Sequence, residues 1–116
     1  PLFEWGMNKD NVKYWPYWQN SEYVHVNQDK VLVSMWTLPD RALLCAVNLD
    51  KARTRNTAIR IPLHELGLKP EIRAEYMKAK DILKEEEVTF DAWNGTVRVD
   101  VRPRDFRLIS IRTYTN

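Results

Sequence analysis

The chain has 116 residues, which is enough for one domain with its own hydrophobic core but not for two independent cores. Hydrophobic residues make up 44% and charged residues 29%, as in globular proteins, and no apolar run is long enough to cross a bilayer, so we expect no membrane partner. The 18 basic and 16 acidic residues leave a net charge of +2, too small a surplus to predict nucleic-acid binding. The single cysteine, Cys45, excludes an internal disulfide and lies in an apolar run, which predicts an inert buried thiol.

The first 21 residues are rich in aromatic side chains and show little periodicity. They include the run YWPYWQN (14–20), in which Pro16 favours an extended backbone. No targeting signal is visible, and we expect the chain to be a segment of a longer or processed protein. We therefore divide it into an aromatic segment at an interdomain junction (1–21) and one folded domain (22–116).

The middle of the chain predicts strands with a period of two. A strand is expected over 22–27, followed by a hairpin of 30–38 and 41–49 around the turn Pro39-Asp40. Both hairpin strands are apolar on two faces, which is typical of central strands. In residues 57–63, Ile59, Ile61 and Leu63 face one way, and Pro62 places this strand at a sheet edge or ends it.

The last third continues the pattern. Residues 63–68 predict one helical turn, and residues 71–79 alternate like a strand although their propensities favour a helix; we choose a strand. Residues 87–93 and 96–101 predict a hairpin around Asn94-Gly95 with a type I′ turn, and 106–114 predict the final strand. The result is an all-β fold, an antiparallel β-sandwich of about eight short strands with Greek-key-like returns.

No catalytic or metal-binding pattern stands out. His25 and His64 have no ligand-type residues at suitable spacing, and Ser34 and Ser110 lack the glycine-flanked elbow of a nucleophile. The adjacent glutamates 85–87 are expected to point apart and to lie in a solvated loop. We expect no catalytic residue, no metal, no cofactor and no enzyme activity in this chain.

The aromatic run therefore holds most of the functional information, and its key side chains are Trp15, Tyr17 and Trp18. These rings could stack on the apolar faces of sugars, or they could seal the sandwich and contact a neighbouring domain. We favour packing. The chain contains five more large rings that matter to the same question, namely Trp5, Tyr14, Tyr23, Trp36 and Trp93.

Four phrases in order suggest a family: WPYWQNSEYV, VLVSMWTLPDRALLCAVNLD, TAIRIPLHELGL and VRPRDFRLISIR. Together they resemble the C-terminal β-sandwich domains that follow catalytic (β/α)₈ barrels in glycoside hydrolases. The nearest likeness is to the tail of family-123-type, uncharacterised glycoside-hydrolase-like proteins and, more loosely, of α-galactosidase-like enzymes. The resemblance implies a non-catalytic domain whose partner is the barrel, and a secreted or periplasmic parent protein.

Two alternatives to this accessory domain remain at the level of sequence. One is a carbohydrate-binding module, in which two or three exposed Trp and Tyr rings lie coplanar on the surface. The other is a β-sandwich that binds another protein. Ring geometry separates the first alternative from the accessory domain, because mutually packed rings favour structure whereas coplanar exposed rings favour sugar.

Overall fold

The computed structural model describes residues 2–63 and 76–113, and this part of the chain is almost entirely β-structure. It has one short helix and nine strands, which confirms the expected all-β class. The elements are α1 (Leu2–Trp5), β1 (Lys13–Trp15), β2 (His25–Val26), β3 (Val31–Leu38), β4 (Arg41–Asn48), β5 (Arg55–Arg60), β6 (Met77–Asp81), β7 (Glu86–Asp91), β8 (Thr96–Val101) and β9 (Phe106–Thr113). No helix in the described ranges has the length and apolar character of a membrane span.

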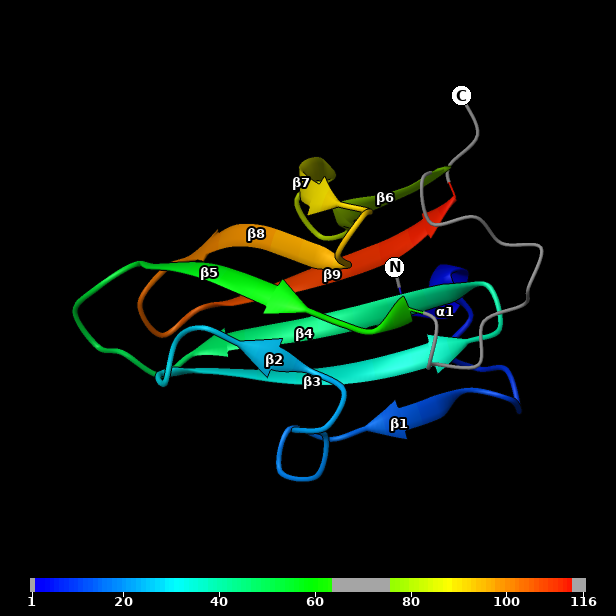
Figure 1. Ribbon diagram of the computed structural model, residues 1–116, viewed down its shortest axis with the longest axis horizontal. Helices are drawn as coiled ribbons and strands as arrows, with labels where there is room; N and C mark the ends of the chain where they lie inside the picture. Colours follow the sequence, from blue (N-terminus) through cyan, green and yellow to red (C-terminus); the bar gives the residue numbers. More distant parts are fainter. Residues whose placement is uncertain (1, 64–75, 114–116) are drawn as a thin grey trace.

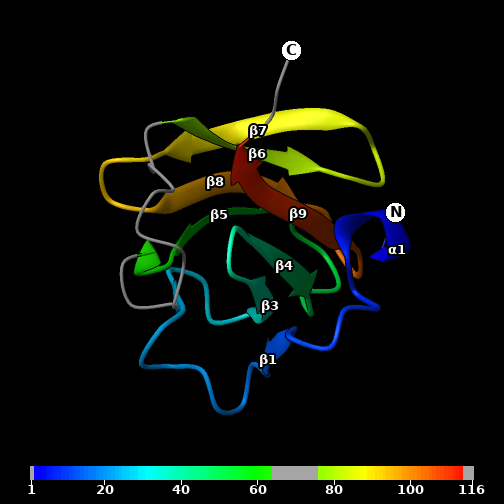
Figure 2. The same cartoon turned by 90° about the vertical axis from the view of Figure 1, so that its right-hand side faces the viewer.

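The nine strands form one antiparallel sheet in the order β1-β3-β4-β9-β6-β7-β8-β5-β2. The sheet curls at β7, because residues 86–88 pair with β6 whereas residues 89–91 pair with β8. In Figure 1 the sheet runs from β1 at the bottom to β6 and β7 at the top, and Figure 2 shows it curled on itself. The result is sandwich-like. One layer contains β1, β3, β4, β9 and β6, and the other contains β7, β8, β5 and β2.

Aliphatic side chains fill the space between the layers. They alternate along the strands with outward-facing side chains, as a period of two requires. Ile59, Ile61 and Leu63 all belong to this core, as their spacing predicts. The core residues are Val24, Val31, Val33, Met35, Ala42, Leu44, Ala46, Ile59, Ile61, Leu63, Met77, Ala79, Val97, Val99, Val101, Ile109 and Ile111.

A buried ion pair joins the strands near the curl. Arg107 of β9 donates from Nε to Asp81 Oδ2 of β6 at 2.6 Å, and their side chains are only 9% and 1% exposed. The same guanidinium donates to Glu86 of β7 and to the Asp100 carbonyl of β8. One side chain therefore connects four strands where the two layers meet.

Several expected boundaries are corrected by the structure. The strand expected over 22–27 is paired only at 25–26, and the one expected over 57–63 spans 55–60 and ends before Pro62. The expected strand over 71–79 is observed only as β6 from Met77, while 71–75, like most of the expected turn at 63–68, lies outside the described residues. The aromatic segment supplies α1 and β1, which periodicity did not predict, because β1 is only three residues long and relies on β3 for its pairing.

The turn between β7 and β8 also differs from the prediction. Asp91 pairs with Thr96, so four residues, 92–95, form the loop and β7 ends two residues early. A type I′ turn needs positive φ at both central residues, but Asn94 is not among the residues with positive φ and only Gly95 has it, at +67°. Trp93 consequently lies in the loop rather than at the end of a strand.

Candidate functional site

The structure separates the three predicted aromatic residues into two environments. Trp15 lies on β1 and is partly buried against the core between the layers, where its indole N–H donates to Thr37 Oγ1 at 3.0 Å. Its ring also packs edge-on against Tyr23, with centroids 4.8 Å apart. Trp15 therefore packs within the domain.

Tyr17 and Trp18 lie on the outside, with 46% and 61% of their surface exposed. Tyr14 and Trp36 lie beside them, and we call these four residues the aromatic cluster. The planes of Tyr17 and Trp18 meet at 88°, and those of Tyr14 and Trp18 at 82°. These rings pack against one another edge to face and form no coplanar platform.

Hydrogen bonds fix the aromatic segment to β3. The buried Asn20 side chain donates from Nδ2 to the carbonyl oxygens of Trp15 and Val33, at 2.9 and 2.8 Å. The Tyr17 N–H donates to Ser34 Oγ at 3.2 Å. The aromatic cluster is consequently positioned by the domain itself.

The outer face of the first layer stays apolar over β1 and β3, whereas Arg112 of β9 and Lys78 and Lys80 of β6 place charges on its far side. Residues directly opposite one another on paired strands share a face. Tyr14 pairs with Trp36, and Trp36 pairs with Leu43, so these side chains form one row across β1, β3 and β4. A second row on this face contains Leu32, Val47 and Phe106, and Phe106 is 44% exposed.

The N-terminal residues cover part of this face. Trp5 of α1 is buried together with Leu38, Leu43 and Leu108, and Cys45 packs at the margin of the same group. Burial raises the pKa of the Cys45 thiol, which favours the unreactive protonated form. Arg41 holds α1 in place by donating to the Trp5 carbonyl.

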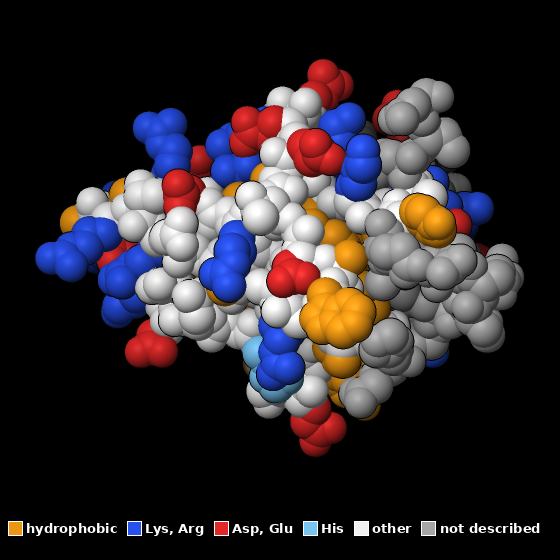
Figure 3. Space-filling view, turned by 45° about the horizontal axis from the view of Figure 1, so that its top comes forward, with side chains coloured by type: hydrophobic (Ala, Val, Ile, Leu, Met, Phe, Trp, Pro, Cys, Tyr) orange, Lys and Arg blue, Asp and Glu red, His pale blue; other side chains and the backbone are white. Residues whose placement is uncertain are grey.

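The outer face of the second layer has the opposite character. On β8, Arg98 and Asp100 point outward between buried valines, and Asp100 accepts a hydrogen bond from Asn56 of β5 at 2.8 Å. Figure 3 shows basic and acidic side chains interspersed on the face over β5, β7 and β8, with hydrophobic side chains only as isolated patches. One outer face of the domain is thus suited to water, and the β1–β3 side of the other is suited to an apolar neighbour.

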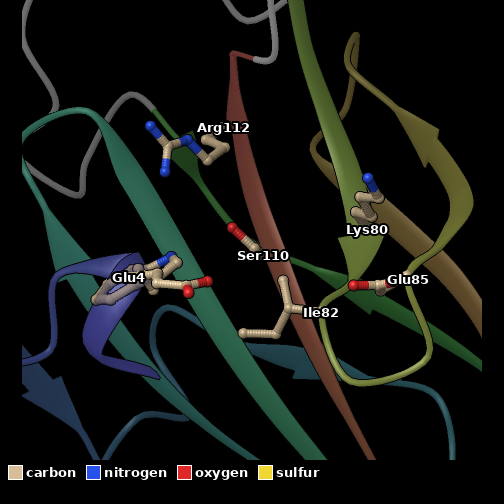
Figure 4. Close-up of a pocket in the computed structure, with 7 residues that line it drawn as sticks. Glu4, Lys80, Ile82, Glu85, Ser110 and Arg112 are labelled. Carbon is tan, nitrogen blue, oxygen red and sulfur yellow. The ribbon is translucent and has the colours of Figure 1, made fainter. Parts of the chain in front are cut away.

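A shallow hollow of about 260 Å³ lies beside α1. In Figure 4, Glu4 lines it from α1 and Glu85 from the opposite side, while Ser110 and Arg112 project from β9. The hollow therefore receives carboxylates from two different elements of the fold.

The remaining predicted candidates are scattered. Glu86 pairs with Arg107 and Glu87 with Lys78, while Glu85 lines the hollow, so the three side chains point apart. Only Glu85 lies in a turn, because Glu86 and Glu87 belong to β7, which corrects the expected loop. His25 is exposed on β2, and His64 lies outside the described residues. Within the described residues, no three His, Cys, Asp or Glu side chains come together as a metal site would require.

Sequence reasoning missed two features of the surface. It did not place Trp36 and Phe106 on the same outer face as the aromatic run, because that requires the register of four strands. It also named Trp93 only among the large rings of the chain and did not predict its exposure, which is 96% in the structure. The pair Asn94-Gly95 marks a turn directly after Trp93. A two-residue turn at this pair places Trp93 at the end of a strand, whereas the observed loop of four residues includes it.

A protein family described as "GLGE, C-terminal" matches residues 23–110. None of the curated proteins matches the sequence. Among solved structures, the chain is similar to a noncanonic maltogenic alpha-amylase, AmyB, from Thermotoga neapolitana, with a TM-score of 0.55 and 16% sequence identity. That similarity covers 97% of this chain but 24% of the amylase chain, and at this identity it shows a shared fold.

Proposed function

Since the chain belongs to the GLGE C-terminal family, we propose that it is a non-catalytic accessory domain of a carbohydrate-active enzyme, and that its apolar outer face packs against a catalytic (β/α)₈ barrel. The similar structure is named an alpha-amylase, and the three quarters of it that this chain does not cover are enough for a catalytic domain. The finer likeness to family-123-type or α-galactosidase-like proteins stays a prediction.

The contrast between the two outer faces is the observation that carries this proposal. The second layer presents alternating charges, whereas the first presents the aromatic cluster and the row that ends at Phe106. Large exposed apolar patches on a folded domain mark sites of contact with another domain or protein. The aromatic segment is itself part of this face, through the pairing of β1 with β3.

A sugar-binding role for the aromatic cluster is less well supported. A sugar stacks on a flat and open ring face, but Tyr14 and Trp36 already cover one face of each other, and Trp18 stands nearly perpendicular to both of its neighbours. Edge-to-face packing of this kind contributes stability through the rings' own contacts. The cluster is better suited to the centre of an interdomain contact.

The test compares two tryptophans within one molecule, the longest natural polypeptide that contains this chain, which we call the parent polypeptide. It is treated with N-bromosuccinimide under native conditions, and oxidation is followed by peptide mass spectrometry. Trp18 and Trp93 are 61% and 96% exposed in the isolated domain. We expect Trp18 to be protected by the barrel. If Trp18 is oxidised as fast relative to Trp93 as its exposure in the isolated domain predicts, docking at this face is rejected.

The non-catalytic part of the proposal has its own test. In the parent polypeptide, Glu85→Gln and Ser110→Ala alter the hollow beside α1, which is lined by polar and charged side chains. We expect kcat to stay within about twofold of the wild-type value, because a non-catalytic domain contributes no group to the reacting atoms. A loss of about 100-fold or more in either variant would place catalysis in this domain.

A further inference from the structure

One end of the second layer carries an exposed tryptophan beside a row of polar side chains. Trp93, with 96% of its surface exposed, lies in the loop between β7 and β8 and makes no ring contact with the described aromatic residues. Both faces of its indole are therefore open. Among the described residues it is the most exposed large hydrophobic side chain.

The loop that carries Trp93 is held rigidly. The Trp93 N–H donates to Asp91 Oδ1 at 3.0 Å, and Ile61 N donates to the Gly95 carbonyl at 2.9 Å. Gly95 has a positive φ of 67° and lies so close to Ile61 that an added Cβ would be 2.3 Å from its carbonyl oxygen. The ring is thus presented to solvent from a backbone that is hydrogen-bonded at both ends of the loop.

A row of polar side chains begins at this loop. Asp91 pairs with Thr96, Thr96 with Arg60, and Arg60 with His25, so the four residues lie next to one another across β7, β8, β5 and β2. With strands about 4.8 Å apart, the row extends over about 14 Å. All of these side chains except Thr96 are exposed. In Figure 3, histidine, basic, acidic and bulky hydrophobic side chains lie close together on this face.

We propose that Trp93 and this polar row, Asp91, Arg60 and His25, form a surface subsite for a neutral pyranose polymer. A pyranose ring has an apolar C–H face that stacks on an open indole, and its edge carries hydroxyl groups. A carboxylate, a guanidinium and an imidazole supply the acceptors and donors that hydroxyl groups need. The row holds both signs of charge, which suits an uncharged ligand, and its length suits several sugar units in succession.

This subsite rests on the proposed function, because it gives a carbohydrate-active enzyme a second place to hold its polymer. It is separate from the docking face. Trp93 belongs to the second layer, whereas the aromatic cluster belongs to the outer face of the first. A barrel docked on the first layer would leave Trp93 free to bind.

The experiment measures protection of Trp93 in the parent polypeptide. It is oxidised with N-bromosuccinimide alone and in the presence of soluble starch, hydroxyethylcellulose or galactomannan, and the peptide containing Trp93 is quantified. We expect at least one polymer to protect Trp93, and the identity of that polymer gives the linkage and the sugar. Absence of protection by all three rejects the subsite. Slow oxidation of Trp93 without any polymer also rejects it, because a neighbouring protein surface would then cover the ring.

Variants then test the assigned residues by affinity electrophoresis in a gel containing the protecting polymer. Trp93→Ala is expected to weaken binding by about tenfold or more, Arg60→Ala by less, and Trp93→Phe should retain part of the affinity. Lys51→Ala, an exposed cation in another loop, is the matched control and should bind like the wild type. Equal retardation of Trp93→Ala and the wild type overturns the assignment. If no polymer binds at Trp93 but Trp18 is protected from oxidation in the parent polypeptide, the subsite is rejected and the accessory-domain proposal stands.

Discussion

Tyr14 of β1 and Trp36 of β3 stack face to face on the outside of the domain, with ring centroids 5.0 Å apart and planes 18° apart. The two residues are direct partners in the β1–β3 register, so the stack joins the aromatic segment to the sheet through side chains as well as through backbone. Cross-strand aromatic pairs are among the stronger contacts between neighbouring strands. This pair therefore attaches residues that periodicity alone would have left outside the fold.

The stack predicts a measurable coupling between the two residues. In a double-mutant cycle with Tyr14→Ala and Trp36→Ala, we expect a coupling free energy of about 0.5–1.5 kcal/mol in urea unfolding, because each single variant already removes the contact. The exposed ring of Trp93 provides the control. Trp93→Ala should change the free energy of unfolding by less than about 0.5 kcal/mol, since its ring packs on no other described ring. Additive effects for Tyr14 and Trp36 would contradict the stack.

The buried pair of Arg107 and Asp81 predicts a larger loss. Arg107→Met keeps the bulk of the side chain but leaves the carboxylate of Asp81, 1% exposed, without its partner. We expect a loss of about 3–5 kcal/mol in the free energy of unfolding, as for other buried pairs that lose one member. The measurement is equilibrium unfolding in urea at neutral pH.

Lys78 offers the matched control for this substitution. It pairs with Glu87 at 3.8 Å, and both side chains are more than half exposed. Lys78→Met should cost about 1 kcal/mol or less, because water screens exposed pairs. If Arg107→Met is no more destabilising than Lys78→Met, Arg107 does not hold the layers together in the way that its four-strand position suggests.

Much of the fold could be predicted from residue pattern. Val97, Val99 and Val101 alternate with charged residues, and Pro39-Asp40 marks a turn, so β8 and the β3–β4 hairpin follow from sequence alone. The curl of the sheet could not be predicted in this way. It depends on β7 changing partner after Val88, and a change of partner leaves no periodic signal in the strand itself.

The site was harder to predict than the fold. The sequence identified Trp15, Tyr17 and Trp18 as the candidate contact residues. Their positions along the chain do not indicate which of the three side chains points into the core. Their environments depend on long-range contacts, such as that of Trp15 with Thr37. Trp93 shows the same limit, since a strand that ends two residues earlier than expected leaves its ring in solvent instead of on the sheet.

Gly95 allows a direct test of the loop that presents Trp93. Gly95→Ala places a Cβ 2.3 Å from the Ile61 carbonyl oxygen at a residue whose φ is positive. We expect a loss of about 1–3 kcal/mol, because both the clash and the backbone conformation are unfavourable. Thermal unfolding followed by circular dichroism measures the effect. Asn94→Ala, at the neighbouring position without positive φ, is the control and should cost less; the reverse order would show that the loop is not clamped at Gly95.

Asn20 tests how the aromatic cluster is held. Its amide donates to two carbonyl oxygens, one on β1 and one on β3, and its side chain is 4% exposed. Asn20→Ala leaves both acceptors without this donor, so we expect a loss of about 1–3 kcal/mol and faster amide hydrogen exchange in residues 13–20 than in β8. Gln19→Ala, at the exposed neighbouring position, is the control. Uniform acceleration of exchange across the domain would mean that Asn20 supports the fold as a whole and not this segment.

Asp50 predicts how stability depends on pH. The backbone N–H of Ala52 and then the guanidinium of Arg55 stabilise its charged form and lower the pKa of Asp50 from 3.8 to about 2. Above pH 3.8 this carboxyl is charged in both the folded and the unfolded chain, and its stabilising contribution is complete. As the pH falls from about 4 toward 2, the unfolded chain takes up the proton first, and the contribution is lost. In Asp50→Asn the side-chain oxygen can still accept the hydrogen bond from Ala52, but the side chain cannot ionise. The free energy of unfolding of this variant should therefore change less with pH than that of the wild type between about pH 4 and 2. Urea unfolding at intervals between pH 6 and pH 2 measures both curves, and parallel curves for the two proteins would show that Asp50 does not carry this pH dependence.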